Sequence, residues 1–274
     1  MDMIREHTER DLAGELPRLY ELHTCEHVDD MLTATVDYAA EGADEGTLLW
    51  AHSQSAGRGR LDRPWLSPPG ALHCGLVLRP EVGLASALET ILVAQVALGC
   101  AIAEQVSPMT ELRYRWPNDI LLSGAKAAGL NLAVGPLHSA RETRDVIPEW
   151  VALAIQVNVR AAPPELGFAA ASLRTEGDSE GDAADLLVAF ARQFLSWINR
   201  WADEGLAPVR RAWLQRPTGL EEACRFELPE GAMDATFVDL GPHGEAVVTL
   251  ADGGSRALSL AEYFGLASAH SDSR

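Results

Sequence analysis

The chain has 274 residues, 47% of them hydrophobic, and a formal net charge of −18 at pH 7. The acidic balance favours solubility and argues against a broad nucleic-acid-binding surface, and no apolar run reaches the roughly 18 residues of a membrane span. The charged N-terminus is unlike a signal peptide, and the scattered cysteines form no CxxC pair (Cys25, Cys74, Cys100 and Cys224). We therefore expect a cytoplasmic protein without disulfides or a zinc knuckle.

The first half of the chain predicts alternating strands and helices. We expect a first strand to begin within residues 16–22, a helix over 28–40 with Asp29 or Asp30 near its start, and strands over 47–52 and 72–79. Ser86 and Glu89 have the spacing of a capping box before an apolar run of helical length that extends to Val106.

The second half predicts a hairpin, a strand, two helices and a β-rich end. We expect a strand over 112–116, a hairpin over 120–132, a strand over 149–159, a flexible acidic loop over 176–185, and helices over 185–204 and 208–215. After Arg216–Gly219, short β-like runs alternate with turns over 224–228, 236–240, 246–250 and 257–260, which suggests a small β-barrel followed by a frayed tail over 267–274.

The most informative segment is QSAGRGRLDRPWLSPP, residues 54–69. Arg58, Arg60 and Arg63 fall within six residues, and each guanidinium offers a fork of donors suited to phosphate or carboxylate. Gly57 and Gly59 allow backbone conformations that would let the loop fold tightly around a ligand. The alternative is a basic surface loop that pairs with nearby acids.

A second polar segment, RWPNDILLSGAKAAG, covers residues 115–129. A tight turn at Ser123-Gly124 would bring Asn118 and Asp119 towards Lys126, and an amide, a carboxylate and an ammonium suit a magnesium-nucleotide site. The alternative is a hairpin whose Asp caps a turn and whose Lys is solvated.

Together these segments resemble the biotin protein ligase family, in which a GRGRxGRxWxSPxG loop precedes a [KR]WPND segment and a KxxG lysine. Here those motifs are residues 57–70, 115–119 and 126–129, and the segment 151–159 resembles a later strand of the family that ends in Asn158. The resemblance implies an α+β catalytic domain, related to class II synthetases, with a mixed, mainly antiparallel sheet and flanking helices over residues 1–217. It also implies a small SH3-like β-barrel over residues 218–274.

The resemblance implies an ATP-dependent ligase that forms biotinyl-5′-AMP with Mg²⁺ and transfers biotin to a lysine of a carrier domain. The implied catalytic residues are Lys126, Arg60 and Asp119, and no residue is assigned as a metal ligand. The implied binding residues are Gln54, Gly57, Arg58, Gly59, Arg60, Arg63, Trp65, Asn118, Lys126, Gly129 and Asn158. A DNA-binding role is not expected, and a homodimer is possible.

Four departures from the family pattern lie near the expected acyl pocket. Leu61-Asp62 replaces a usual x-Gly, the acid that usually follows KxxG is missing at Ala133, and the segment after Pro69 is one residue short. Ala154 and Gln156 stand where small residues approach biotin. Gln156 is expected to weaken biotin binding, either by filling part of the pocket or by adding polar groups that require partners. These departures leave open a ligase for another acid, such as lipoate or octanoate, and a relative that binds without ligating.

A further cluster is formed by His23, Cys25 and His27, which alternate and would face one side of a strand. Three such ligands could bind a transition metal. The alternative is a partly buried sheet edge near the acyl pocket.

Overall fold

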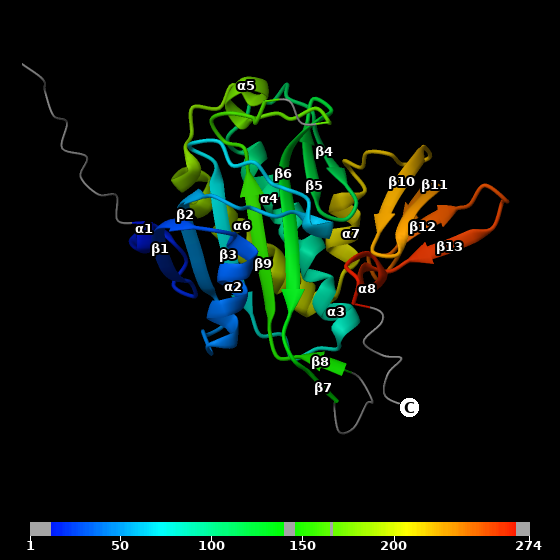
Figure 1. Ribbon diagram of the computed structural model, residues 1–274, viewed down its shortest axis with the longest axis horizontal. Coiled ribbons are helices and arrows are strands. Elements are labelled where there is room, and N and C mark those ends of the chain that lie inside the picture. Colours follow the sequence, from blue (N-terminus) through cyan, green and yellow to red (C-terminus); the bar gives the residue numbers. More distant parts are fainter. Residues whose placement is uncertain (1–11, 140–145, 165–166, 267–274) are drawn as a thin grey trace, which may run out of the picture.

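A seven-stranded mixed sheet forms the centre of the protein (Figure 1). The computed structural model describes residues 12–139, 146–164 and 167–266. The strand order is β1-β2-β3-β9-β6-β5-β4, and only the β1–β2 pair is parallel among these neighbours. The strands are β1 (Glu21–Val28), β2 (Thr47–Gln54), β3 (Leu72–Leu78), β4 (Leu112–Arg115), β5 (Asp119–Leu122), β6 (Ala125–Val134) and β9 (Val151–Val157). The expected fold class is confirmed.

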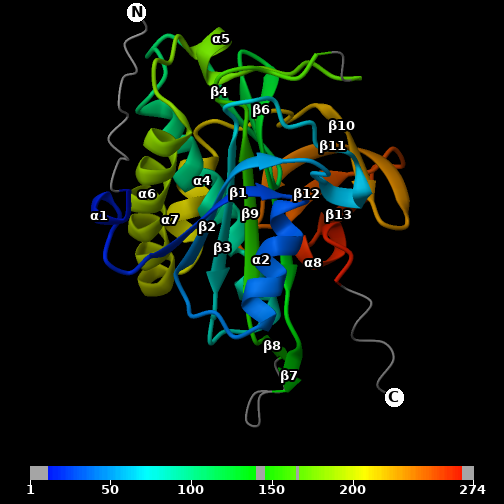
Figure 2. The same cartoon turned by 60° about the vertical axis from the view of Figure 1, so that its left-hand side comes forward.

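One face of this sheet is covered by a layer of helices, which Figure 2 shows on one side of the strands. The layer consists of α1 (Leu12–Glu15), α3 (Leu84–Leu88), α4 (Thr90–Ala103), α6 (Ala183–Glu204) and α7 (Ala207–Trp213). The stretch 84–103 is apolar and long enough to cross a membrane, but 83% of its most apolar window is buried inside the fold, as in the core helix of a globular protein. The amphipathic α6 packs on α4 and ends at Gly205, as predicted.

The opposite face carries α2 (Met31–Ala40), which Asp30 caps by accepting a hydrogen bond from the Thr33 N–H. Met31 is fully buried in a small cluster with Leu49 and Ala154. Among the described helices, only α2 covers this face of the sheet (Figure 2).

The C-terminal part forms a second, four-stranded antiparallel sheet in the order β10-β11-β12-β13, with β10 and β13 at its edges. Its elements are β10 (Ala223–Leu228), β11 (Gly231–Leu240), β12 (Ala246–Thr249), β13 (Ser255–Leu258) and the helix α8 (Leu260–Tyr263). Trp116 of the first sheet donates its indole N–H to the Gly244 carbonyl at 2.8 Å, which joins the two sheets. The expected tail over 267–274 lies outside the described residues.

Two local expectations were wrong. Ser86 does not cap the long helix, because α3 starts after Gly83 without a side-chain cap and the Glu89 carboxylate accepts the Trp201 indole N–H at 2.7 Å instead. The acidic segment 176–185 is ordered rather than a solvated connection. It overlaps the end of α5 (Leu173–Gly177), buries Ser179 and supplies Asp182 as the N-cap of α6. A short hairpin, β7 (Leu137–Ser139) with β8 (Val146–Pro148), and a 3₁₀ turn at Arg60–Asp62 complete the described elements.

Candidate active site

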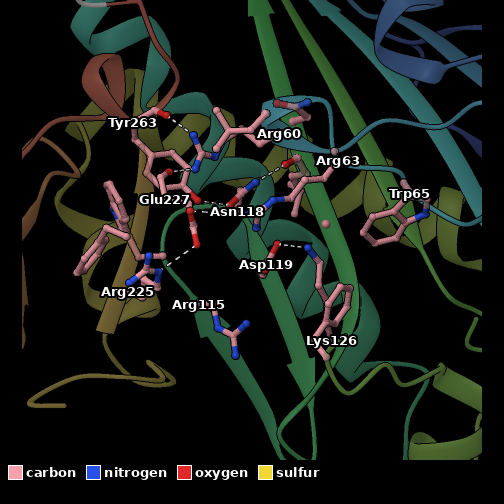
Figure 3. Close-up of a pocket in the computed structure, with 18 of the residues that line it drawn as sticks. Arg60, Arg63, Trp65, Arg115, Asn118, Asp119, Lys126, Arg225, Glu227 and Tyr263 are labelled. Atoms are coloured by element: carbon pink, nitrogen blue, oxygen red, sulfur yellow. Dashed lines mark hydrogen bonds and ion pairs between the residues drawn. The ribbon is translucent and has the colours of Figure 1, made fainter. Parts of the chain in front are cut away.

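A cavity of about 540 Å³ lies where the first sheet meets the C-terminal sheet (Figure 3). Most of the residues expected in the site line it: Arg58, Gly59, Arg60, Arg63, Trp65, Asn118, Asp119, Lys126 and Gly129. Three segments that are separate in the sequence therefore line one cavity and supply its cationic groups.

The Lys126–Asp119 ion pair forms the polar centre of the cavity. The predicted hairpin exists, with Ser123 and Gly124 both at positive φ in its turn, and it places Nζ of Lys126 2.7 Å from Oδ1 of Asp119. The Lys126 side chain is only 20% exposed, and its ammonium lies 5.2 Å from the centre of a Trp65 ring. Lys126 is thus held inside the site, and the solvated alternative is wrong.

Gln95 holds the turn that precedes this pair, and the sequence analysis missed its role. Its Nε2 donates to the carbonyls of Asp119 at 2.7 Å and Arg115 at 3.0 Å, while its Oε1 accepts the Trp213 indole N–H at 2.7 Å. In the sequence, the role of Gln95 is indicated only by its position as a polar residue within the otherwise apolar helix α4. Buried polar side chains need partners, and here they fix the backbone of the site.

Asn118 uses its side chain within the protein. Its Nδ2 donates to the Leu130 carbonyl at 2.7 Å, and its Oδ1 accepts the Tyr263 hydroxyl at 3.4 Å. Burial raises the pKa of this tyrosine. Asn118 therefore joins β5, β6 and α8 at the cavity.

The arginine loop has an ordered backbone with an unexpected glycine pattern. Gly59 has φ −88°, a backbone conformation that any residue can adopt, and a Cβ there would have room. At Gly57 only glycine fits, because a Cβ would lie 2.1 Å from the Gln54 amide nitrogen. The positive φ angles fall instead on Leu61, at 56°, and Asp62, at 55°. The expectation that both glycines supply unusual conformations was wrong.

All three loop arginines have partners. Arg60 lies 3.7 Å from the centre of the Tyr263 ring and donates to the carbonyls of Tyr263 and Glu227. Arg63 pairs with the Glu227 carboxylate at 3.4 Å, and Arg58 pairs with Asp62 at 3.2 Å. The alternative of a basic loop paired with acids therefore describes Arg58 and Arg63 but not Arg60, and all three arginines also line the cavity.

The C-terminal sheet contributes site residues that the sequence analysis did not identify. Arg225, Glu227 and Tyr263 line the cavity opposite the first sheet, and Arg115 lines it from the end of β4 (Figure 3). Arg115 begins the RWPND segment, which could have indicated it. No local pattern marks the other three.

Three expected site residues lie behind the cavity wall rather than on it. Gln54 is 8% exposed, and its Oε1 accepts the Met31 N–H at 2.7 Å. Gly57 packs against Gln54, and Asn158 lines a smaller neighbouring pocket while donating to the Ala171 carbonyl at 3.0 Å. These residues support the loops around the site.

Part of the cavity wall is formed by β9, which contributes Ala154 and Gln156, and by Gly129 of the neighbouring strand β6. Gln156 faces His73 of β3 in the strand register, and burial lowers the pKa of His73 to about 4. His73 is therefore neutral near pH 7. The buried Oε1 of Gln156 has no hydrogen-bond partner.

The His23, Cys25 and His27 side chains do not assemble a metal site. Within the described residues, no three His, Cys, Asp or Glu side chains gather to hold a metal ion. His23 packs edge-on against Tyr38, Cys25 donates to the Trp50 carbonyl, and His27 bonds to serines. The observed arrangement is the partly buried sheet edge.

This fold and this cavity define a class of ligase. Residues 16–215 match the profile of the Biotin/lipoate A/B protein ligase family, and the chain belongs to that family. It is 34% identical over 230 residues to the biotin--[acetyl-CoA-carboxylase] ligase of Paracoccus denitrificans, covering 78% of this chain and 92% of that protein. It is 29% identical to the bifunctional ligase/repressor BirA of Bacillus subtilis, covering 82% of this chain and 69% of that protein.

Solved structures agree on the fold. The biotin protein ligase of Aquifex aeolicus in complex with biotin and ATP superposes with a TM-score of 0.70 at 22% identity, over 88% of this chain and 97% of that one. A biotin protein ligase-like protein of unknown function from Silicibacter sp. superposes with a TM-score of 0.73 at 21% identity, over 91% and 98%. Family membership confirms the expected ligase class.

Proposed function

We propose that the protein is an ATP-dependent biotin ligase that forms biotinyl-5′-AMP and transfers biotin to a lysine of a carrier domain. The observation that carries this proposal is the joining of the arginine loop, the Lys126–Asp119 pair and the β6–β9 wall in one cavity. The relatives named as biotin ligases support the choice of acid.

In the first step, a carboxylate oxygen of biotin attacks the α-phosphorus of ATP, and pyrophosphate leaves. Negative charge increases on the reacting phosphoryl oxygens, and preorganised cations stabilise it best where water is excluded. Lys126 is held in the wall with its side chain only 20% exposed, so we assign it to the α-phosphate and the acyl carboxylate. Arg58, Arg60 and Arg63 are mounted on a loop that can turn towards the nucleotide.

The donor set fits Mg²⁺ held chiefly by the nucleotide. Mg²⁺ commonly takes one or two carboxylates together with substrate phosphates, and it would neutralise phosphate charge when bound. Asp119 is the carboxylate within the cavity wall closest to Lys126, and it is the residue we assign.

In the second step, the ε-amine of a carrier lysine attacks the mixed anhydride carbonyl. An amide bond forms, the bond to phosphate breaks, AMP leaves and the amine loses its proton. We assign residues 1–217 to the catalytic domain and 218–274 to a second domain whose Glu227 and Tyr263 complete the cavity rim.

The test is biotin-dependent exchange of pyrophosphate into ATP, followed by transfer of labelled biotin to a purified biotin carboxyl carrier domain. We expect both reactions with the wild-type carrier; when the acceptor lysine of the carrier is replaced by arginine, transfer should be lost while biotin-dependent exchange continues. Exchange that no added biotin stimulates would contradict the proposal.

A further inference from the structure

Gln156 is a buried polar side chain of β9 that lines the cavity beside Gly129 of β6. It is 4% exposed, and its neighbours on the wall, Ala154 and Gly129, offer no polar side chain. Asn131 also lines this wall, but its Oδ1 already accepts the Leu132 N–H at 3.0 Å. Gln156 Oε1 is the wall acceptor that lacks a partner among the described residues.

A chain of hydrogen bonds fixes which way the Gln156 carboxamide points. The backbone N–H of Met31, at the start of α2, can only donate, so the Gln54 atom 2.7 Å away must be an oxygen. That oxygen also faces Gln156 at 3.4 Å, so the Gln156 atom there must be the NH₂ group. Oε1 of Gln156 therefore remains in the cavity wall as a buried acceptor without a donor among the described residues.

We propose that Gln156 determines acyl specificity by accepting a hydrogen bond from an N–H or O–H group on the acyl part of the substrate. This inference rests on the proposed function and names the class of acid. A buried acceptor without a donor is destabilising, and a ligand donor removes that cost. An acid with an apolar tail leaves Oε1 unpaired. A site that hydrogen-bonds a polar group of its substrate strongly rejects analogues without that group.

The cyclic urea of biotin carries two N–H donors, whereas octanoate and lipoate carry none at the distal end. Calorimetry with each acid therefore tests the inference on the intact chain. We expect wild type to bind biotin at least about 100-fold more tightly than either apolar acid. The Gln156→Met variant keeps the side-chain length. Its affinity for biotin should fall about 10-fold or more, and its affinity for octanoate should not fall.

Ala154→Gly is the matched control, because it alters the same strand and wall without changing a polar group. Ala154→Gly should change the binding affinity for all three acids by the same factor. Equal wild-type affinity for biotin and octanoate, an unchanged ratio in Gln156→Met, or no binding of any of the three acids would each overturn the inference. Thermal unfolding of each variant verifies that the fold is retained.

The result is separable from the proposed function. Gln156-dependent binding of biotin without pyrophosphate exchange would contradict the ligase proposal and support the role of Gln156. Exchange driven by octanoate as well as by biotin would support adenylation and overturn the role of Gln156.

Discussion

The guanidinium of Arg60 lies 3.7 Å from the centre of the Tyr263 ring, so the arginine loop packs against the helix α8 of the C-terminal part. Two carbonyls, from Tyr263 and Glu227, accept its N–H groups. A cation over an aromatic face is worth about 0.5–2 kcal/mol, so this contact is strong enough to hold the loop yet weak enough for a ligand to replace it.

Tyr263→Leu should therefore loosen the loop. Loss of about 1 kcal/mol raises the open population about fivefold, and trypsin cleavage near Arg58 and Arg63 should accelerate to a similar extent in the ligand-free protein. Tyr38→Leu on α2, 38% exposed, is the matched control. Identical cleavage rates in both variants would show that Tyr263 does not restrain the loop.

Lys126→Ala should reduce adenylation about 10²–10³-fold, because a positioned cation at a phosphoryl centre contributes about that much. The measurement is pyrophosphate exchange in a variant with native circular dichroism. Arg113→Ala serves as the control, since Arg113 forms an exposed pair with Glu111 on β4. Full activity without Lys126 would remove it from the mechanism.

Arg60→Ala should speed dissociation of the acyl-adenylate more than dissociation of the free acid. Charge-assisted bonds to phosphate are strong, and only the adenylate carries the phosphate. Stopped-flow dissociation of both ligands compares the two rates. Equal changes for both would argue that the loop does not close on the product of the first step.

The local parts of the site were predictable, and the long-range parts were not. The hairpin that pairs Asp119 with Lys126 follows from apolar runs around a Ser-Gly turn, which are features of adjacent residues. Tyr263 lies 203 residues from Arg60, and Gln54 lies 102 residues from Gln156, so only the fold brings each pair together. Glu89 is a further example, because its carboxylate accepts a hydrogen bond from the distant Trp201 instead of forming the capping box that the local sequence predicts.

His73 should make the protein less stable in mild acid. Burial lowers its folded pKa to about 4, below the usual 6.5, so the unfolded chain binds more protons between these values. The contribution of His73 to the free energy of unfolding is constant above pH 6.5 and falls as the pH is lowered. At pH 5 it is about 2 kcal/mol less favourable than at neutral pH. Urea unfolding of His73→Gln should lose less stability from pH 8 to 5 than wild type.

Asp62 restrains Arg58, and removing its charge should strengthen retention of the adenylate. The carboxylate holds Arg58 at 3.2 Å, while both Asp62 and Leu61 occupy the left-handed backbone region. Asn tolerates that region as Asp does, so Asp62→Asn removes the charge and keeps the backbone. An exposed ion pair is worth about 0.2–1 kcal/mol, so adenylate dissociation should slow up to about fivefold.

Two further variants separate charge from backbone at this position. Leu61→Gly relaxes the backbone and keeps the Arg58–Asp62 pair, so it should not slow dissociation. Asp62→Gly removes the carboxylate but also adds flexibility to the loop, so it should retain the adenylate less well than Asp62→Asn. If Leu61→Gly slows dissociation as much as Asp62→Asn does, the effect comes from the backbone and the proposed restraint of Arg58 is wrong.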